Sequence, residues 1–269
     1  MNPTYRQALA QLRGAQKPAA RSAPAYSRFV NRRWGRYLAA GAASRGLSPD
    51  AVTGISALCT FSGIAVLALV PISVGSGVLV AFLLALGYAF DSADGQVARL
   101  QGRSSTAGEW LDHVVDAAKS VILPLGLGVA LWRSDAVDDR WVVLPLVSTV
   151  VTSVLFFAMI LTEQLRRVHG VRSRADVDPG SRSWVRALLV IPMDYGVLCW
   201  SFVLLGFLPV FLGVYTVITA ASGLFLLLAA AKWYRELAAL DAVRATAGAS
   251  QTAVPPGASG SPSAEQVPA

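Results

Sequence analysis

The sequence predicts an all-α integral membrane protein with six transmembrane helices, preceded by an amphipathic helix at the membrane interface. The chain has 269 residues, of which 54% are hydrophobic and only 14% are charged, and its mean hydropathy is positive. Its apolar segments have the length of about 20 residues that is needed to cross ~30 Å of hydrocarbon. These segments cover residues 51–71, 76–97, 109–132, 141–165, 184–206 and 208–231.

The segment before the first apolar run is predicted to lie along the membrane surface. Within residues 26–38, apolar side chains share one helical stripe and arginines share another. This pattern is typical of a helix in the headgroup region, and a polar-faced helix of a globular protein is the alternative. The apolar stripe contains Tyr26, Phe29, Val30, Trp34, Tyr37 and Leu38, and the basic stripe contains Arg28, Arg32 and Arg36.

Signals near Ser48 and Leu240 set the bounds of the membrane domain. Ser48 is a helix-capping residue, Pro49 suits the first helical position, and Asp50 places an acid in the first turn. After Leu240 the chain turns to Ala, Gly, Ser and Pro, which predicts disorder. We therefore expect an N-terminal segment over 1–47, a membrane domain over 48–240, and a disordered tail over 241–269.

A polar stretch from Asp91 to Asp116 lies between the second and third apolar runs. If these runs are helical, Asp91 and Asp94 are i,i+3 neighbours on one face, and Asp112 and Asp116 are i,i+4 neighbours on another. The connection between the runs is short, so the two helices should be antiparallel with their acidic ends together. Four carboxylates would then face one small volume.

Such a group of carboxylates indicates a site for divalent cations. Like charges repel one another unless cations compensate them, and oxygen-only ligands favour Mg²⁺, Mn²⁺ or Ca²⁺ over zinc. Gly95, Ala98 and Gly108 leave the backbone open to a ligand, and the guanidinium of Arg99 matches phosphate oxygens. A solvated helix end is the simpler interpretation of a single aspartate pair, but an acid in the bilayer core costs about 2.5–3.5 kcal/mol and tends to be functional. The residues together suggest a site for a metal-bound diphosphate.

The same stretch resembles a known signature. Its pattern, D-x2-D-G-x2-A-R-x8-G-x3-D-x3-D, looks like the full signature of the CDP-alcohol phosphatidyltransferases, and every fixed position is filled. The match is far more specific than a lone glycine-rich loop, and the resemblance extends more loosely over about residues 48–236. The fixed positions are Asp91, Asp94, Gly95, Ala98, Arg99, Gly108, Asp112 and Asp116.

The resemblance implies a reaction in phospholipid biosynthesis. A phosphatidyl group would pass from a CDP-alcohol, usually CDP-diacylglycerol, to the hydroxyl of a small polar alcohol, with release of CMP. The four aspartates would hold Mg²⁺ or Mn²⁺, as two ions, and Asp116 would be the general base. A homodimer is also implied. The residues implied to bind the CDP-alcohol are Ser48, Pro49, Asp50, Gly95, Ala98, Arg99, Ser105 and Gly108, with helix capping as the alternative role for Ser48 and Asp50.

The basic residues are distributed unevenly between the two sides of a six-span arrangement. One side carries the arginines of the N-terminal segment, of the second–third loop and of the fourth–fifth loop, whereas the other side carries only Arg133 and Arg140. The positive-inside rule then predicts that both termini and the acidic cluster are on the cytoplasmic side of the cell membrane. Despite the net charge of +7, basic residues at the ends of apolar runs fit membrane topology better than a nucleic-acid groove.

The acceptor alcohol is left open by the sequence. Where members of the resembled family that use inositol phosphate or glycerol phosphate tend to carry charged runs, this chain has LTEQLRRVHG and SRSWVRALLV. We expect Arg186 to read a phosphate of a small polyol and Asp194, about 12 Å further along a helix, to accept a hydroxyl. The alternative is that the arginines of this loop serve topology alone.

Two other classes of protein compete with the enzyme. A divalent-cation transporter or channel also has carboxylates within the membrane, but it would need them at several depths rather than at one end. A membrane scaffold with a degenerate acidic motif is the third interpretation, and the intact signature argues against it. Formation of CMP from CDP-diacylglycerol distinguishes the three.

Overall fold

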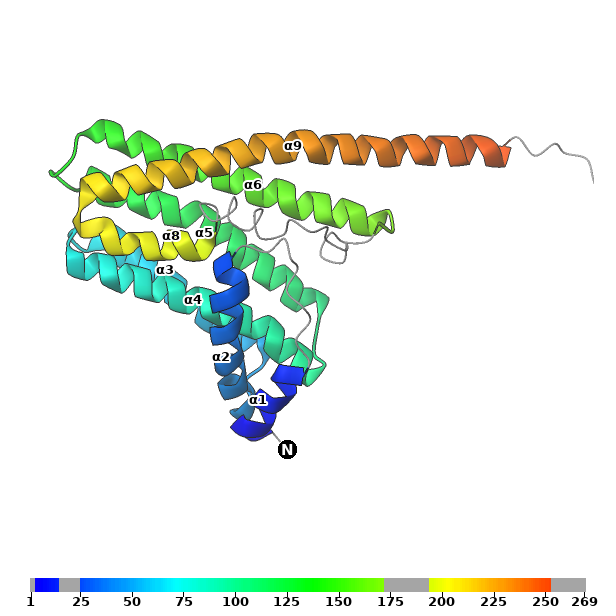
Figure 1. Ribbon diagram of the computed structural model, residues 1–269, viewed down its shortest axis with the longest axis horizontal. Helices are drawn as coiled ribbons and strands as arrows, with labels where there is room; N and C mark the ends of the chain where they lie inside the picture. Colours follow the sequence, from blue (N-terminus) through cyan, green and yellow to red (C-terminus); the bar gives the residue numbers. More distant parts are fainter. Residues whose placement is uncertain (1–2, 15–24, 172–193, 253–269) are drawn as a thin grey trace, which may run out of the picture.

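The computed structural model describes residues 3–14, 25–171 and 194–252, and every element within these ranges is a helix. Three helical segments precede the membrane bundle, and Figure 1 shows α2 crossing the bundle axis at a steep angle. They are α1 (Tyr5–Gly14), η1 (Ser27–Asn31) and α2 (Arg32–Ser44). The bundle consists of α3 (Pro49–Leu69), α4 (Val74–Gln101), α5 (Thr106–Trp132), η2 (Asp139–Val142), α6 (Val143–Val168), α8 (Tyr195–Ser201), η5 (Phe202–Gly206) and α9 (Leu208–Thr252).

Five of the described helices are long and apolar enough to cross a membrane, which confirms the all-α membrane class. They match the first four and the last of the six predicted segments. The remaining segment, 184–206, is described only from Asp194 onward, where it forms the short helices α8 and η5. In Figure 1 the α3–α4, α5–α6 and η5–α9 connections lie together at one end of the bundle.

The predicted amphipathic segment is helical from Ser27 to Ser44, through η1 and α2. Phe29, Trp34 and Tyr37 are 61%, 60% and 40% exposed, as expected for side chains that reach a lipid surface. The opposite face packs on the bundle through small residues, which allow a close approach to α4. Those buried residues are Gly35, Ala39, Ala40, Ala42 and Ala43.

Helix α1 lies in a stretch where we predicted no helix. Its Ala8 and Leu12 are buried in an apolar cluster with residues of α2 and with Val97 near the end of α4. The N-terminal helices therefore pack against the end of α4 that carries the acidic signature.

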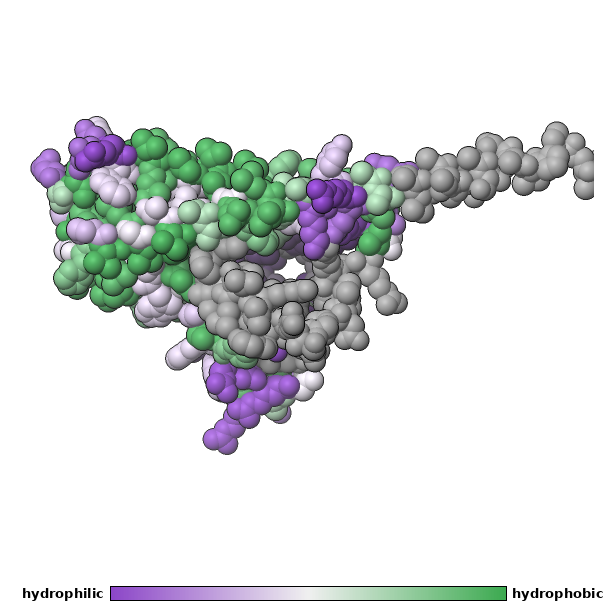
Figure 2. All heavy atoms as spheres, turned by 45° about the horizontal axis from the view of Figure 1, so that its top comes forward, coloured by the Kyte–Doolittle hydropathy of each residue, from purple (hydrophilic) through white to green (hydrophobic). Residues whose placement is uncertain are grey.

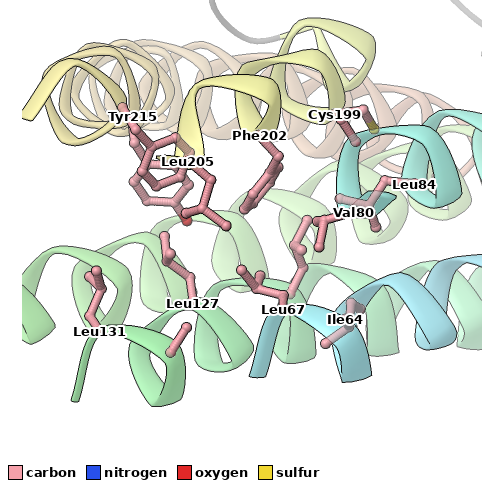
Figure 3. Close-up of a cluster of buried hydrophobic side chains, with 14 of the residues drawn as sticks. Ile64, Leu67, Val80, Leu84, Leu127, Leu131, Cys199, Phe202, Leu205 and Tyr215 are labelled. Atoms are coloured by element: carbon pink, nitrogen blue, oxygen red, sulfur yellow. The ribbon is translucent and has the colours of Figure 1, made fainter. Parts of the chain in front are cut away.

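The main apolar core forms among residues of α3, α4, α5, α8, η5 and the start of α9. Phe202 and Leu205 of η5 join Leu67, Leu84 and Leu127, and each of these side chains is at most 1% exposed. Figure 3 shows these side chains converging between the helices. Because lipid tails are as apolar as leucine, the stabilisation within a membrane comes from close packing rather than from removal of the side chains from water.

Helices α3 and α4 cross closely, and this crossing aligns the ends that form the site. Ser56 Oγ donates a hydrogen bond to the Gly87 carbonyl at 2.8 Å. A Cβ at Gly87 would overlap Thr60 Oγ1, so only glycine permits this approach. Thr53, about one turn before Ser56 on α3, and Asp94, about two turns after Gly87 on α4, lie toward the same end of the crossing and face each other.

The outer surface of the bundle is apolar, as a lipid-facing surface must be. Only 11% of the apolar window of α6 is buried inside the protein. Figure 2 shows hydrophobic side chains covering the body of the molecule and hydrophilic ones at its extremities. The exposed apolar side chains include Val150, Val154 and Phe157 on α6 and Val217 and Leu224 on α9.

Helix α9 extends beyond the predicted end of the last span and past the predicted domain bound at residue 240. It continues to Thr252, so the start of the predicted disordered tail is helical. The physical reason is that residues 242–250 are rich in alanine, the strongest helix former. Residues 253–269 lie outside the described residues.

Candidate active site

The acidic signature lies where the ends of α3, α4 and α5 meet. Helix α3 begins after Ser48, whose Oγ accepts a hydrogen bond from Ala51 N at 3.2 Å. Helix α4 ends at Gly102, which has a φ of +62°, a conformation that suits glycine at a helix C-terminus. Helix α5 begins after Ser105, whose Oγ accepts a hydrogen bond from Gly108 N at 3.0 Å. These caps fix the short turn that the sequence predicted between the two signature helices.

Three of the four signature aspartates come together in space. One carboxylate oxygen each from Asp91, Asp112 and Asp116 can be chosen so that all three oxygens lie within 4.8 Å of one another. Asp91 belongs to α4, and the other two belong to α5. The predicted convergence of the acidic ends of two helices is therefore present for these three residues.

Asp94 has partners of its own. Its Oδ2 accepts a hydrogen bond from Thr53 Oγ1 on α3 at 2.7 Å, and its Oδ1 accepts one from Gly95 N. The sequence analysis did not identify Thr53. Its hydroxyl holds the Asp94 carboxylate at the groove described below, which Asp94 shares with Asp112.

A lysine lies among the clustered carboxylates. Lys119 Nζ donates hydrogen bonds to Asp91 Oδ1 and Asp116 Oδ1, each at 2.7 Å, and its side chain is 6% exposed. We had expected divalent cations to compensate the four acids, and the structure adds a cation of the chain itself beside two of them. A basic residue inside an apolar run, three positions after Asp116 on the same helical face, was the signal that could have found it.

A groove of about 260 Å³ opens beside the acidic cluster. A Cβ at Gly108 would lie 3.1 Å from both Asp50 Oδ1 and Ser105 Oγ, so the glycine keeps the groove open. Arg103, which the sequence analysis used only for topology, also lines it. The lining residues are Pro49, Asp50, Thr53, Asp94, Gly95, Ala98, Arg103, Ser104, Ser105, Gly108, Glu109 and Asp112.

Six of the residues expected to bind a CDP-alcohol thus line one groove, and the other two lie beside it. Arg99 extends back along α4, where its Nη1 would lie 3.5 Å from a Cβ at Gly95. Ser48 has the alternative role that we considered, because its hydroxyl caps α3. Ser105 caps α5 and also lines the groove.

The end of α6 reaches the rim of this groove through ion pairs. Arg167 Nη1 lies 2.6 Å from Glu109 Oε1, and Glu109 lines the groove. Arg166 forms a hydrogen-bonded ion pair with Glu236 on α9. Two arginines of the fourth–fifth loop that we had considered for topology and for an acceptor pocket therefore connect α6 to α5 and α9.

Asp194 is not one of the three clustered carboxylates, and it caps two segments. Its Oδ2 accepts a hydrogen bond from Tyr26 N at 2.7 Å, and its Oδ1 accepts one from Gly196 N at 3.1 Å. The residue is 0% exposed, and Trp200 Nε1 donates to the nearby Tyr26 hydroxyl at 3.0 Å. Burial is the largest cause of a raised pKa for the Tyr26 phenol, which keeps it neutral. The structure thus gives Asp194 a capping role.

The other member of the expected acceptor pocket, Arg186, lies outside the described residues. The role of these two residues in acceptor binding stays a prediction. For Asp194, binding of an acceptor hydroxyl would compete with capping, because both carboxylate oxygens already accept hydrogen bonds from backbone N–H groups.

The donor set fits a hard divalent cation. All of the clustered groups are carboxylates, and such oxygen ligands suit Mg²⁺ or Mn²⁺. Lys119 orients two of these carboxylates, those of Asp91 and Asp116, and Thr53 orients the remaining signature carboxylate, that of Asp94, as the groups around a metal site commonly do.

The fold and the site define a multi-pass membrane enzyme that handles a charged substrate at one end of a helical bundle. The family model for CDP-alcohol phosphatidyltransferase matches residues 47–229, about two thirds of the chain, so the chain belongs to the CDP-alcohol phosphatidyltransferase family. It is accordingly a transferase. A search of curated proteins found no match to the chain.

Proposed function

We propose that this enzyme transfers a phosphatidyl group from CDP-diacylglycerol to the hydroxyl of a small polar alcohol and releases CMP. The observation that supports the proposal most strongly is the position of the acidic cluster. Asp112 belongs both to the three clustered carboxylates and to the groove lined by signature residues. A diphosphate bound in the groove would therefore lie next to the acids.

The groove supplies recognition of the donor. Gly95, Ala98 and Gly108 present little side-chain bulk, so the diphosphate and ribose can approach the backbone. The N-terminus of α5 favours an anion, and Arg99 and Arg103 supply positive charge at the end of α4. The diacylglycerol chains would remain in the lipid beside the exposed apolar faces of the bundle.

Asp91, Asp94, Asp112 and Asp116 are the residues that would hold Mg²⁺ or Mn²⁺, as two ions. When bound, these ions would neutralise the charge that develops on the departing CMP. Thr53 keeps Asp94 directed toward the groove, and Lys119 keeps Asp116 beside Asp91. The protein thereby fixes the ligands before the substrate arrives.

Asp116 is proposed as the general base. Its Oδ1 accepts the hydrogen bond from Lys119, which leaves Oδ2 to accept a proton. The acceptor hydroxyl attacks the phosphorus of the phosphatidyl group, its proton passes to Asp116, and the P–O bond to CMP breaks. The products are one phospholipid and one CMP.

The proposed orientation places both termini and the site in the cytoplasm, where nucleotides are. The basic residues at the site end of the bundle and the sparse basic residues Arg133 and Arg140 at the other end support it. A homodimer is proposed from membership of the family alone. Neither statement is needed for the chemistry of a single site.

An acceptor screen tests the proposal. Purified enzyme in detergent is given labelled CDP-diacylglycerol with inositol phosphate, glycerol phosphate, inositol, glycerol or serine, with Mg²⁺ or with EDTA. We expect one acceptor to yield labelled phospholipid and CMP in equal amounts, and only with the metal. Product formation at the same rate in EDTA would contradict the metal-dependent mechanism.

A further inference from the structure

Lys119 is a cation of the chain in the position where an external cation would otherwise be required. Its Nζ lies 2.7 Å from a carboxylate oxygen of Asp91 on α4 and 2.7 Å from one of Asp116 on α5. The side chain is almost fully buried, so water cannot replace these carboxylate contacts around the ammonium group. Burial of a charged lysine is unfavourable unless charged partners surround it, and here two carboxylates do so.

The two acids that Lys119 contacts are also two of the three that converge into a possible metal site. Each offers one oxygen to Nζ. A divalent ion drawn to the same carboxylates must therefore compete with the ammonium for these oxygens or bind against its positive charge. Because the Lys119 side chain is almost fully buried while the acids are partly exposed, repulsion between the ammonium and a divalent ion at these oxygens would be stronger than in bulk water.

Charge counting gives the lysine a second consequence. Four carboxylates and two divalent ions alone sum to zero, whereas the same set with Lys119 carries one positive charge. A site with a positive sum attracts the anionic diphosphate of the donor more strongly than a neutral one does. The lysine would thus lower the metal affinity of the site and raise the positive charge that faces the diphosphate.

We propose that Lys119 is a positioning residue that acts as a built-in counter-cation. It holds Asp91 and Asp116 together across α4 and α5 and lowers the affinity of the cluster for divalent ions. This inference rests on the proposed metal dependence. The proposed role of Lys119 differs from that of a purely structural ion pair in one measurable respect. Removal of the lysine charge should strengthen metal binding.

The test is a titration of the purified full-length protein with Mn²⁺, followed by electron paramagnetic resonance of the free ion. The variants are Lys119→Met, which removes charge and hydrogen bonds, Lys119→Gln, which removes charge only, and Lys119→Arg, which keeps the charge. Lys232→Met is the matched control, because Lys232 is exposed on α9 and makes no contact with the acidic cluster.

We expect the Kd for Mn²⁺ to fall by about 10-fold or more in Lys119→Met and Lys119→Gln, from the lost like-charge repulsion. Lys119→Arg and Lys232→Met should stay within about 3-fold of wild type, because the charge at position 119 is kept in both. Should Lys119→Met fail to fold, Lys119→Gln decides.

An unchanged or higher Kd for Mn²⁺ in Lys119→Met and Lys119→Gln would overturn the proposed role of Lys119 but not the proposed metal dependence. Absence of Mn²⁺ binding to the wild-type protein would overturn the proposed metal dependence and this role with it. The two failures are thus distinguishable in one experiment.

Discussion

The Thr53 hydroxyl on α3 donates a hydrogen bond to Asp94 Oδ2 on α4 at 2.7 Å, in a position where both side chains are buried. This hydrogen bond joins the first helix of the bundle to the acidic signature. It implies that the orientation of a proposed metal ligand depends on a residue 41 positions earlier in the chain.

Replacement of Thr53 by valine should weaken metal binding. The shape of the side chain is kept while the hydrogen bond to the carboxylate is lost, and groups that orient metal ligands typically contribute about 10–100-fold in affinity. Mn²⁺ titration of Thr53→Val measures this, with Thr53→Ser as a control that keeps the hydroxyl. Equal Mn²⁺ affinity in the valine variant and wild type would show that Asp94 needs no such support.

Gly108→Ala should impair donor binding without unfolding the protein. The added methyl group would lie 3.1 Å from Asp50 Oδ1 and from Ser105 Oγ, so it would fill the groove or force its walls apart. We expect the KM for the CDP-alcohol to rise. Gly54→Ala on α3 is the matched control, since no atom lies within 4 Å of a Cβ there. If Gly108→Ala and Gly54→Ala have the same KM for the CDP-alcohol, Gly108 is not part of the donor site.

Arg99→Lys should not be a mild change. Lysine keeps the positive charge but lacks the planar fork that binds two phosphate oxygens at once. We expect weaker binding of the CDP-alcohol while Mn²⁺ affinity stays near that of wild type. Calorimetric titration with the donor and with Mn²⁺ separates the two effects, and unchanged donor affinity would exclude a phosphate contact by Arg99.

Asp194→Ala should destabilise the protein more than it changes acceptor affinity. The variant leaves the backbone N–H groups of Tyr26 and Gly196 without their carboxylate partner, and loss of such a cap typically costs about 0.5–2 kcal/mol. Thermal unfolding in detergent measures this, with Asp135→Ala in the exposed α5–α6 connection as the control. A variant with wild-type stability and a much higher KM for the acceptor would instead support the acceptor-pocket hypothesis.

The proposed orientation predicts which positions react with impermeant thiol reagents. In a protein that lacks Cys59 and Cys199, single cysteines introduced as Pro3→Cys or Gly260→Cys should stay unlabelled in intact cells. Val137→Cys, in the α5–α6 connection, should be labelled. The reverse pattern would place the site on the side of the membrane away from cytoplasmic nucleotides.

The sequence was sufficient to predict the helical membrane class, because long apolar segments leave few other folds. It also predicted that the four signature carboxylates converge, and three of them, Asp91, Asp112 and Asp116, do so, since helical periodicity and a short turn constrain where these side chains can lie. The partners from other parts of the chain were not predictable in this way. Thr53 reaches Asp94, and Asp194 reaches Tyr26, only through tertiary packing of helices that are distant in sequence.

Lys119, in contrast, could have been predicted from the sequence. Its spacing from Asp116 and its place in an apolar run were visible in the sequence. We had assigned charge compensation to divalent cations and not to a residue of the chain. We did not predict the helix up to Thr252 because we judged residues 241–269 by their average composition. The alanine-rich stretch at the start of this segment favours a helix.

The central claim is that the acidic cluster catalyses phosphatidyl transfer with Asp116 as the base. The most direct measurement compares CMP release from CDP-diacylglycerol by wild type and by Asp116→Asn, with the acceptor found in the screen and with Mn²⁺ binding measured on the same samples. We predict a rate at least ~10²-fold lower in Asp116→Asn, under Mn²⁺ concentrations that saturate the variant. CMP release at the wild-type rate by metal-loaded Asp116→Asn would contradict the account.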